Sequence, residues 1–296
     1  MLAAVTCYFN PFGNPSREAT VAPFVDSIMP ALETVDGKLF GVELIWDDSP
    51  SVLRTAGVEN VIVICNPNAA RIFQKEALLN IGIQAALDEG FENVGWFDAD
   101  CTFSSNAWAY KSIKALERFD IIQPARSIQS DYSEGMQPAR PSAAFSRKIG
   151  KVHTGGAWIA RKELFDIIRL YPHAILGGGD WCVWGAIYNR IKKTALRDSG
   201  RFRPSILSNL DFAGDWKEWA EKIPAKIKVG STEGKISLLN HGARQTRRYM
   251  ERHKFYRFFN PSRDLFVNSD GVFEWAGSAN REFMKVALRY MENRKC

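Results

Sequence analysis

The chain has 296 residues and a net charge of +6 at pH 7, with 46% hydrophobic and 24% charged residues. This length fits one large α/β domain, or one domain with a smaller appendage, and the composition is that of a soluble globular protein. The longest apolar runs, such as Val61–Cys65, are far shorter than the roughly 20 residues of a membrane helix, so no membrane span is expected. The positive charge favours an anionic partner: a sugar nucleotide, a nucleic acid or an acidic membrane surface.

The five cysteines are scattered, odd in number and without CxxC spacing. A disulfide framework and a zinc site are therefore not expected, and the reducing cytoplasm is the expected location. The chain begins with the apolar run Met1–Cys7, which has no basic region and continues directly into Tyr8-Phe9-Asn10-Pro11. We interpret this run as a first strand rather than as a signal peptide.

Strand-like and helix-like segments alternate through the first third of the chain. Strands are expected at Ala3–Phe9, Leu39–Trp46, Val61–Cys65 and Val94–Phe97, and helices at 16–29, capped by Ser16, and at Ala69–Glu89. This alternation predicts the α/β class, with a mostly parallel central sheet flanked by helices and right-handed crossovers. A ligand then lies outside the carboxyl ends of the strands.

The later segments are less regular. Arg126–Gly150 is polar, and a connection of this length inside a compact domain is usually functional or disordered. Beyond it we expect a strand at Thr154–Ala160, a helix at Lys162–Leu170 and a short strand at Ile236–Leu239. The residues after this strand are basic and predicted to be mostly helical, with a turn at Asp264–Gly271.

Two aspartates, Asp98 and Asp100, follow the apolar run Val94–Phe97. In a strand, residues i and i+2 point to the same side, so the two carboxylates are expected to converge on a cation. Carboxylate oxygens suit Mg²⁺ or Mn²⁺, which also bind phosphate oxygens. The alternative is a pair of solvated loop carboxylates, because a DxD triplet alone is common.

Two blocks of the sequence resemble a known enzyme family. The first contains Leu79-Asn80-Ile81-Gly82 followed by Trp96-Phe97-Asp98-Ala99-Asp100, and the second runs from Thr154-Gly155-Gly156-Ala157-Trp158 through Lys162–Phe165 and Pro172 to Gly178-Gly179-Asp180. In order and spacing they resemble the metal-dependent GT-A glycosyltransferases, most closely the galactosyltransferase-like branch. The stretch that begins at His241-Gly242 also resembles predicted bacteriophage glycosyltransferases, whose location would be the host cytoplasm.

The resemblance implies a GT-A (Rossmann-like) fold and a UDP-sugar donor bound with Mn²⁺ or Mg²⁺. It implies one glycosyltransferase domain over residues 1–240, with a nucleotide-binding half (1–105) and an acceptor half (106–240), followed by a basic, mainly helical extension over 241–296. Asp98, Asp100 and His241 become the metal ligands, with a loop histidine as the alternative for His241. The donor-site residues are Phe9, Asn10, Pro11, Asn66, Arg71, Lys75, Asp98, Gly155, Gly156, Trp158, Gly179 and Arg244. For Lys75 the alternative is a surface residue at the start of a helix.

Asp180 is the expected general base, which takes a proton from the acceptor hydroxyl as this attacks the anomeric carbon. The alternative is an N-cap of the following helix. The family carries an acidic pair after Gly-Gly and a preceding Trp-Gly-Trp, whereas this chain has Leu176-Gly177 and Trp181 at those places, so the donor sugar is not predicted. His153 is a candidate acceptor contact.

The most basic segment follows His241. Arg244, Arg248 and Arg252 fall at i, i+4 and i+8, which would form a stripe on a helix. Three interpretations stay open: a solvated helix face, neutralisation of the leaving diphosphate by Arg244, and contact with a nucleic-acid backbone. The last would suit an acceptor that is a hydroxymethylated base in DNA.

The sequence therefore predicts a glycosyltransferase that moves a hexose from a UDP-sugar to an acceptor hydroxyl, with inversion if a single displacement operates. The acceptor is a hydroxymethylated DNA base or, alternatively, a saccharide, lipid or protein. A nucleotidyltransferase is disfavoured, because Asn10–Pro15 matches a Gly-rich phosphate loop poorly. A non-catalytic nucleic-acid-binding or carbohydrate-binding module of the same fold is the third hypothesis.

Overall fold

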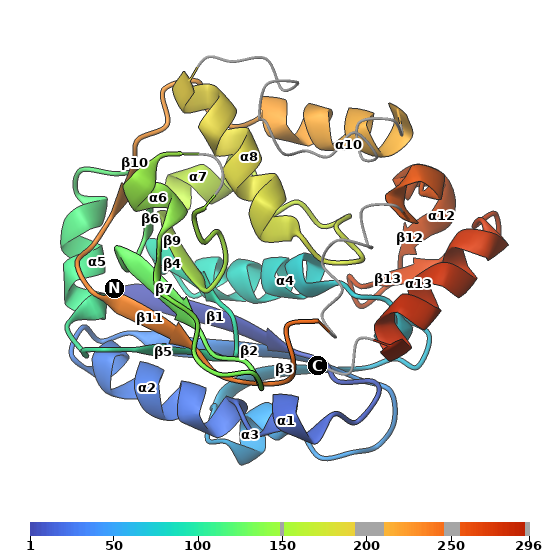
Figure 1. Cartoon of the computed structure of the whole chain (residues 1–296), viewed down its shortest axis with the longest axis horizontal. Coiled ribbons are helices and arrows are strands. Elements are labelled where there is room, and N and C mark those ends of the chain that lie inside the picture. Colours follow the sequence, from blue (N-terminus) through green and yellow to red (C-terminus); the bar gives the residue numbers. More distant parts are fainter. Residues whose placement is uncertain (149–150, 193–209, 246–254, 294–296) are drawn as a thin grey trace.

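The computed structural model describes residues 1–148, 151–192, 210–245 and 255–293. A seven-stranded sheet with the order β10-β6-β9-β4-β1-β2-β3 forms its centre (Figure 1). These strands are β1 (Leu2–Tyr8), β2 (Lys38–Ile45), β3 (Asn60–Cys65), β4 (Asn93–Phe97), β6 (Ile121–Gln123), β9 (Ala157–Arg161) and β10 (Val229–Ser231). β9 runs antiparallel to β4 and β6, while the other pairings are parallel. The predicted α/β class with a mostly parallel central sheet is confirmed.

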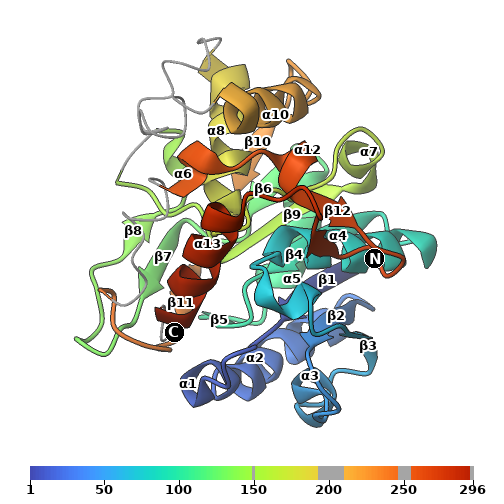
Figure 2. The same ribbon diagram turned by 90° about the vertical axis from the view of Figure 1, so that its right-hand side faces the viewer.

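Helices cover both faces of this sheet (Figures 1 and 2). α2 (Val21–Glu33), α3 (Val52–Thr55) and α5 (Trp108–Leu116) share one apolar core with one face. α4 (Lys75–Asp88), α8 (Gly179–Lys192) and α10 (Leu210–Glu221) share a second core with the other. β1 is buried along its whole length, which explains its continuous apolar sequence. None of the helices in the described ranges is long and apolar enough to span a membrane.

A smaller sheet with the order β5-β11-β7-β8 stands beside the main one. Its strands are β5 (Cys101–Phe103), β7 (Ser127–Ser130), β8 (Arg140–Pro141) and β11 (Lys235–Leu238), and three short helices lie near these strands or the main sheet: α1 (Pro15–Glu18), α6 (Ala143–Ser146) and α7 (Lys162–Phe165). Antiparallel pairing aligns Leu238 with Cys101, and the Leu239 N–H donates to the Asp100 carbonyl at 2.8 Å. This pairing brings His241 next to Asp100.

The described C-terminal residues pack beside α4. They form the 3₁₀ turn η3 (Tyr256–Phe258), α12 (Pro261–Asp264), the hairpin of β12 (Leu265–Val267) and β13 (Phe273–Trp275), and α13 (Arg281–Asn293). The predicted turn at Asp264–Gly271 thus lies largely within a hairpin that the sequence analysis missed. Arg248 and Arg252, two members of the predicted basic stripe, lie outside the described residues.

Several predicted boundaries were wrong for local reasons. The first helix is split into α1, capped by Asn14 rather than Ser16, and α2. The helix expected over Ala69–Glu89 begins only at Lys75, after the 3₁₀ turn η1 (Ala69–Arg71) and an extended Ile72. Gln74 lies between this turn and α4, and its buried side-chain amide is hydrogen-bonded to the backbone of Ala69 and Phe273.

The Leu-Asn-x-Gly motif of α4 has a structural role. Asn80 exchanges two hydrogen bonds of 2.9 Å with the backbone of Leu170. Gly82 allows α4 to pack closely against the sheet, because a Cβ there would lie 2.5 Å from Val5 Cγ1 and 3.0 Å from Val42 Cγ2. The motif thus fixes α4 on β1 and β2.

We predict that Gly82→Ala lowers the free energy of unfolding by about 1–3 kcal/mol, because the added methyl overpacks this contact. Urea unfolding measures the effect. Gly214→Ala is the matched control: position 214 is exposed in α10 with nothing within 4 Å, so the control is expected to gain about 0.5–1 kcal/mol. Equal effects at both positions would contradict the close packing of α4.

Candidate active site at the carboxyl ends of β1 and β4

A cavity of about 440 Å³ lies in the described part of the chain, beside the ends of β1 and β4. Because β1 pairs with β2 on one side and β4 on the other, the chain order reverses here, and ligands of open α/β sheets bind at such a switch point. The cavity is lined by Phe9, Lys75, Asp98, Asp100, Gly155, Asp180, His241 and Arg244 among the predicted site residues. It thus unites residues from both sequence blocks and from the segment after β11.

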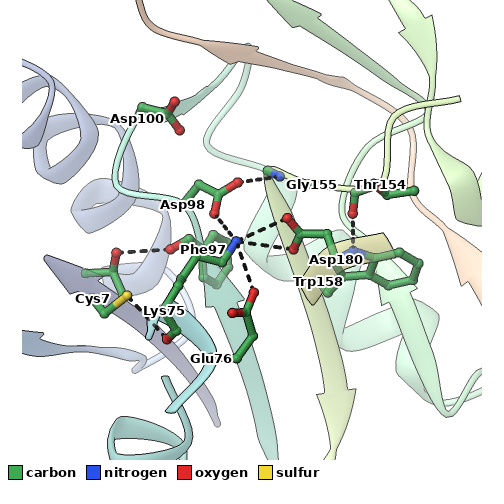
Figure 3. Close-up of polar contacts among 12 residues, drawn as sticks. Cys7, Lys75, Glu76, Phe97, Asp98, Asp100, Thr154, Gly155, Trp158 and Asp180 are labelled. Atoms are coloured by element: carbon green, nitrogen blue, oxygen red, sulfur yellow. Dashed lines mark hydrogen bonds and ion pairs between the residues drawn. The ribbon is translucent and has the colours of Figure 1, made fainter. Parts of the chain in front are cut away.

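Lys75 lies at the centre of the charged groups in this cavity (Figure 3). Its ammonium nitrogen is 2.7 Å from Asp98 Oδ1 and 3.1 and 3.3 Å from the two carboxylate oxygens of Asp180. Glu76 Oε1 lies 3.9 Å away. The Lys75 side chain is only 17% exposed. The alternative of a surface lysine is therefore wrong, and Lys75 joins the DxD region to Asp180.

The protonation states of these groups follow from burial and charge. Burial lowers the pKa of Lys75, but the charges of Asp180, Asp98 and Glu76 outweigh it and raise that pKa well above its ordinary value. Burial raises the pKa of Glu76 to about 7, against the opposing charge of Lys75. Lys75 is thus a permanent cation, whereas Glu76 changes charge near neutral pH.

Glycines allow these side chains to approach one another. A Cβ at Gly155 would lie 3.2 Å from Asp180 Oδ2 and 3.3 Å from Asp98 Oδ2. A Cβ at Gly179 would lie 2.0 Å from Glu76 Oε1, so any side chain there would displace Glu76. Gly155 and Gly179, one glycine from each Gly-Gly pair of the second block, therefore make room for carboxylates.

Asp98 and Asp100 do not converge as predicted. β4 ends at Phe97, and residues 98–101 form a turn in which the Cys101 N–H donates to the Asp98 carbonyl at 3.1 Å. Strand alternation therefore does not apply to the pair. Asp98 is directed at Lys75, with its Oδ2 accepting from the Gly156 N–H at 2.8 Å, while Asp100 points away from Lys75 (Figure 3) and lies 2.9 Å from His241 Nε2.

A divalent cation fits part of this arrangement. No group of three or more His, Cys, Asp or Glu side chains among the described residues is placed to hold a metal. Asp100 and His241 nevertheless give one carboxylate oxygen and one imidazole nitrogen at the cavity wall, a donor pair that Mn²⁺ accepts together with phosphate oxygens. Asp98 lines the same cavity, with Oδ1 in contact with Lys75 and Oδ2 accepting from the Gly156 N–H.

The remaining predicted donor-site residues are divided by the structure. Phe9 lines the cavity, packs edge-to-face on Phe73 and lies under the Arg17 guanidinium, which is 5.5 Å from its ring centre. The cavity lining does not include Asn10, Pro11, Asn66, Arg71, Gly156, Trp158 or Gly179. Two of these glycines contact residues that do line the cavity: the Gly156 N–H donates to Asp98, and the missing Cβ of Gly179 makes room for Glu76.

The side chains of three other residues outside the cavity lining have contacts elsewhere. Trp158 is buried and donates to the Thr154 carbonyl at 2.7 Å. Asn66 donates to Glu274 at 2.9 Å. Asn10 holds the loop before α1 through Asn14.

Asp180 lies in the first turn of α8, which begins at Gly179, so Asp180 is not the N-cap that was the alternative. His153 reaches the cavity, where burial lowers its pKa against the charge of Asp98 and favours the neutral imidazole. Sequence reasoning missed Glu76, although its place beside Lys75 at the start of a helix was a usable signal. It also missed the aromatic wall formed by Trp181, Phe212 and Tyr256.

A second, shallower hollow adjoins the cavity. Its lining contains three basic side chains, Arg140, Lys151 and Arg244, of which Arg140 and Arg244 also line the main cavity. All three are exposed. The carboxylate of Glu134 accepts a hydrogen bond from the Arg244 backbone N–H at 3.2 Å. The hollow is therefore a cationic extension of the site.

No family model matches the chain, and no curated protein sequence matches it. Among similar solved structures, glucosyl-3-phosphoglycerate synthase from Mycobacterium tuberculosis with Mn²⁺, UDP-glucose and phosphoglyceric acid is 16% identical, covering 76% of this chain and 80% of that chain with a TM-score of 0.41. Drosophila β1,4-galactosyltransferase 7 with xylobiose is 13% identical, covering 66% and 62% with a TM-score of 0.35. A Pyrobaculum calidifontis mannosyltransferase with GDP-mannose and Mn²⁺ is 11% identical, covering 64% and 52% with a TM-score of 0.38. At these values no residue role or substrate transfers to this chain.

The raised pKa of Glu76 predicts a pH dependence of stability. The folded pKa of about 7 exceeds the ordinary 4.5, so the folded state binds more protons between these values and stability falls as pH rises through this window. Compared with the parent, Glu76→Gln should therefore gain about 2 kcal/mol on going from acidic to mildly alkaline pH. Urea unfolding at the two ends of the window measures this. Glu282→Gln, at an exposed position, should show no such change, and a flat difference for Glu76→Gln would contradict the raised pKa.

Proposed function

We propose that the chain is a metal-dependent glycosyltransferase of the GT-A type, which moves a hexose from a UDP-sugar to an acceptor hydroxyl with inversion. The observation that carries the proposal is the union, in one cavity at the switch point of the sheet, of Asp98, the Asp100–His241 pair and Asp180. These residues come from distant parts of the chain, and a non-catalytic module would not need them together. A sugar nucleotide has chemistry suited to each part of the cavity.

The diphosphate of the donor suits the Asp100–His241 side. These two residues would hold a divalent cation, which would supply positive charge to the departing diphosphate. Arg244 lines the same cavity and would add a guanidinium to this charge. Phe9 and Phe73, which line the cavity and pack edge-to-face, offer an apolar contact for the base.

Asp180 suits the role of general base. Its side chain is 23% exposed and lines the cavity, so an acceptor hydroxyl can reach it. Lys75 stabilises the ionised carboxylate, which is the form that accepts a proton. As the acceptor oxygen forms its bond to the anomeric carbon, Asp180 takes the hydroxyl proton and the bond from that carbon to UDP breaks. A single displacement of this kind inverts the anomeric centre.

The cationic hollow supports an anionic acceptor. Arg140, Lys151 and Arg244 present three positive charges at the mouth of the cavity, where a phosphate-bearing molecule would be held. A hydroxymethylated base in DNA remains our proposed acceptor. The phosphates of the DNA backbone suit this hollow, and the hydroxymethyl group of the base supplies the attacking oxygen. Saccharide, lipid and protein acceptors are the alternatives.

We expect Asp180→Asn to bind the UDP-sugar as the parent does when Mn²⁺ is saturating, but to lower kcat by about 10²–10⁴-fold, because the amide cannot take the proton. Asp100→Ala should instead lose metal-dependent UDP binding. Calorimetry with UDP and Mn²⁺, together with UDP release from the donor, separates the two effects. Parent-like turnover in Asp180→Asn would remove it from the role of base.

UDP release tests the donor and the acceptor together. We expect Mn²⁺-dependent release from one of UDP-glucose, UDP-galactose or their N-acetyl forms, abolished by EDTA and stimulated by DNA that contains hydroxymethylcytosine. Lys151→Gln should lower the dependence of DNA affinity on salt by about one unit of slope, because one phosphate contact is lost. Lys111→Gln, at an exposed position on α5, is the control. UDP release that this DNA does not stimulate would exclude the DNA as acceptor. Absence of UDP release from every donor would contradict the proposed function.

A further inference from the structure

We propose that Lys75 is a positioning residue that competes with a divalent cation for Asp98 and thereby links the occupancy of the donor site to the placement of Asp180. This inference rests on the proposed function, since it concerns the cation and the base of that reaction. In this inference Lys75 is neither a ligand of the nucleotide nor a surface residue. It makes this lysine the group through which the two halves of the site affect each other.

The ammonium group is placed to act on both carboxylates. It lies 2.7 Å from Asp98 and 3.1 Å from Asp180, so one cation is shared by a residue that follows β4 and a residue in α8. The start of α4 is itself held in place. Cys7 Sγ donates to the Lys75 carbonyl at 3.6 Å, and the neighbouring Gln74 is bonded to Phe273. The backbone of Lys75 is thus fixed by these contacts, while its side chain reaches residues of two separate segments.

Asp98 has one oxygen for which the two cations would compete. Its Oδ2 accepts from the Gly156 N–H at 2.8 Å, a contact fixed by the reciprocal bond from the Asp98 N–H to the Gly156 carbonyl at 2.8 Å. Its Oδ1 contacts Lys75. A divalent cation that drew on Oδ1 would displace Lys75, whereas one that drew on Oδ2 would share that oxygen with the Gly156 N–H. In either case the two positive charges would repel each other.

The competition has a consequence for Asp180. When Asp98 Oδ1 turns to a divalent cation, the ammonium group keeps its two contacts with Asp180 and loses its tie to Asp98. Asp180 then becomes the main partner of Lys75. By linkage, whatever strengthens the hold of Lys75 on Asp98 weakens cation binding by the same factor.

The test measures metal binding apart from turnover. Mn²⁺ binding to the full chain with saturating UDP is followed by electron paramagnetic resonance of free Mn²⁺. Lys75→Gln removes the competing charge, so the Mn²⁺ dissociation constant should fall about tenfold. Because Asp180 is no longer positioned, kcat should fall about 100-fold while the KM for the UDP-sugar stays within about threefold. Lys75→Arg keeps the charge and should restore a Mn²⁺ affinity close to the parent value.

Controls make each outcome informative. Lys38→Gln removes a lysine from an exposed ion pair with Glu89 and should change none of these quantities. Unchanged or weaker Mn²⁺ binding in a folded Lys75→Gln would overturn the inference, because a merely structural lysine predicts that result. A parent protein that binds no Mn²⁺ with UDP would instead contradict the proposed function itself. If circular dichroism shows that Lys75→Gln does not fold, Asp180→Asn replaces it in the test. The asparagine carries no charge to hold Lys75, so Lys75 should bind Asp98 more strongly and Mn²⁺ should bind more weakly. Unchanged Mn²⁺ binding would overturn the inference.

Discussion

The contact of the Lys75 ammonium group with Asp98 and Asp180 is the interaction on which the rest of the site depends. Three acidic groups from three elements meet there: Glu76 of α4, Asp98 after β4 and Asp180 of α8. Without a cation, their mutual repulsion would drive these elements apart or force protonation. Breaking a largely buried ion pair by removing one partner typically costs about 3–5 kcal/mol, so this cluster also holds α8 against the sheet.

The architecture around the cluster explains its unusual density of charge. Parallel strands end at a common edge, and the reversal of chain order between β1 and β4 opens a crevice there that side chains need not fill. The segment before the antiparallel strand β9 places Gly155 and Gly156 at the same edge, where the absence of a Cβ at Gly155 leaves room for carboxylates. The small sheet adds Asp100 and His241 from strands paired in register. In each case the course of the backbone determines which side chains meet in the cavity.

Local patterns in the sequence predicted much of this. Apolar runs with β-branched residues located β1 to β4 within one residue, because a buried parallel strand has to be apolar throughout. The two sequence blocks located Asp98, Gly155 and Asp180, and the short strand before His241 placed that residue beside Asp100. The convergence of Asp98 and Asp100 was wrong because pattern reasoning extended a strand into what is a turn.

Contacts between distant residues set the limit of sequence reasoning. Lys75 was assigned to the nucleotide because nothing local shows that Asp180 would reach it from α8. Gln74, directly before α4, is bonded to Phe273, and no periodicity in either segment records this contact. The resemblance implied a donor-site role for Trp158, Asn66 and Arg71, and none of the three lines the cavity.

The bond between Gln74 and Phe273 also bears on how the protein is made. The Phe273 N–H donates to Gln74 Oε1 at 2.8 Å, and Gln74 Nε2 donates back to the Phe273 carbonyl at 3.3 Å, across 199 positions of the chain. The ribosome delivers β1 to β4 early, and their parallel pairings can form as each strand emerges. Phe273 emerges only after all seven strands of the main sheet have been synthesised. The contact that adjoins Lys75 at the start of α4 therefore cannot form before the strands of the sheet are available.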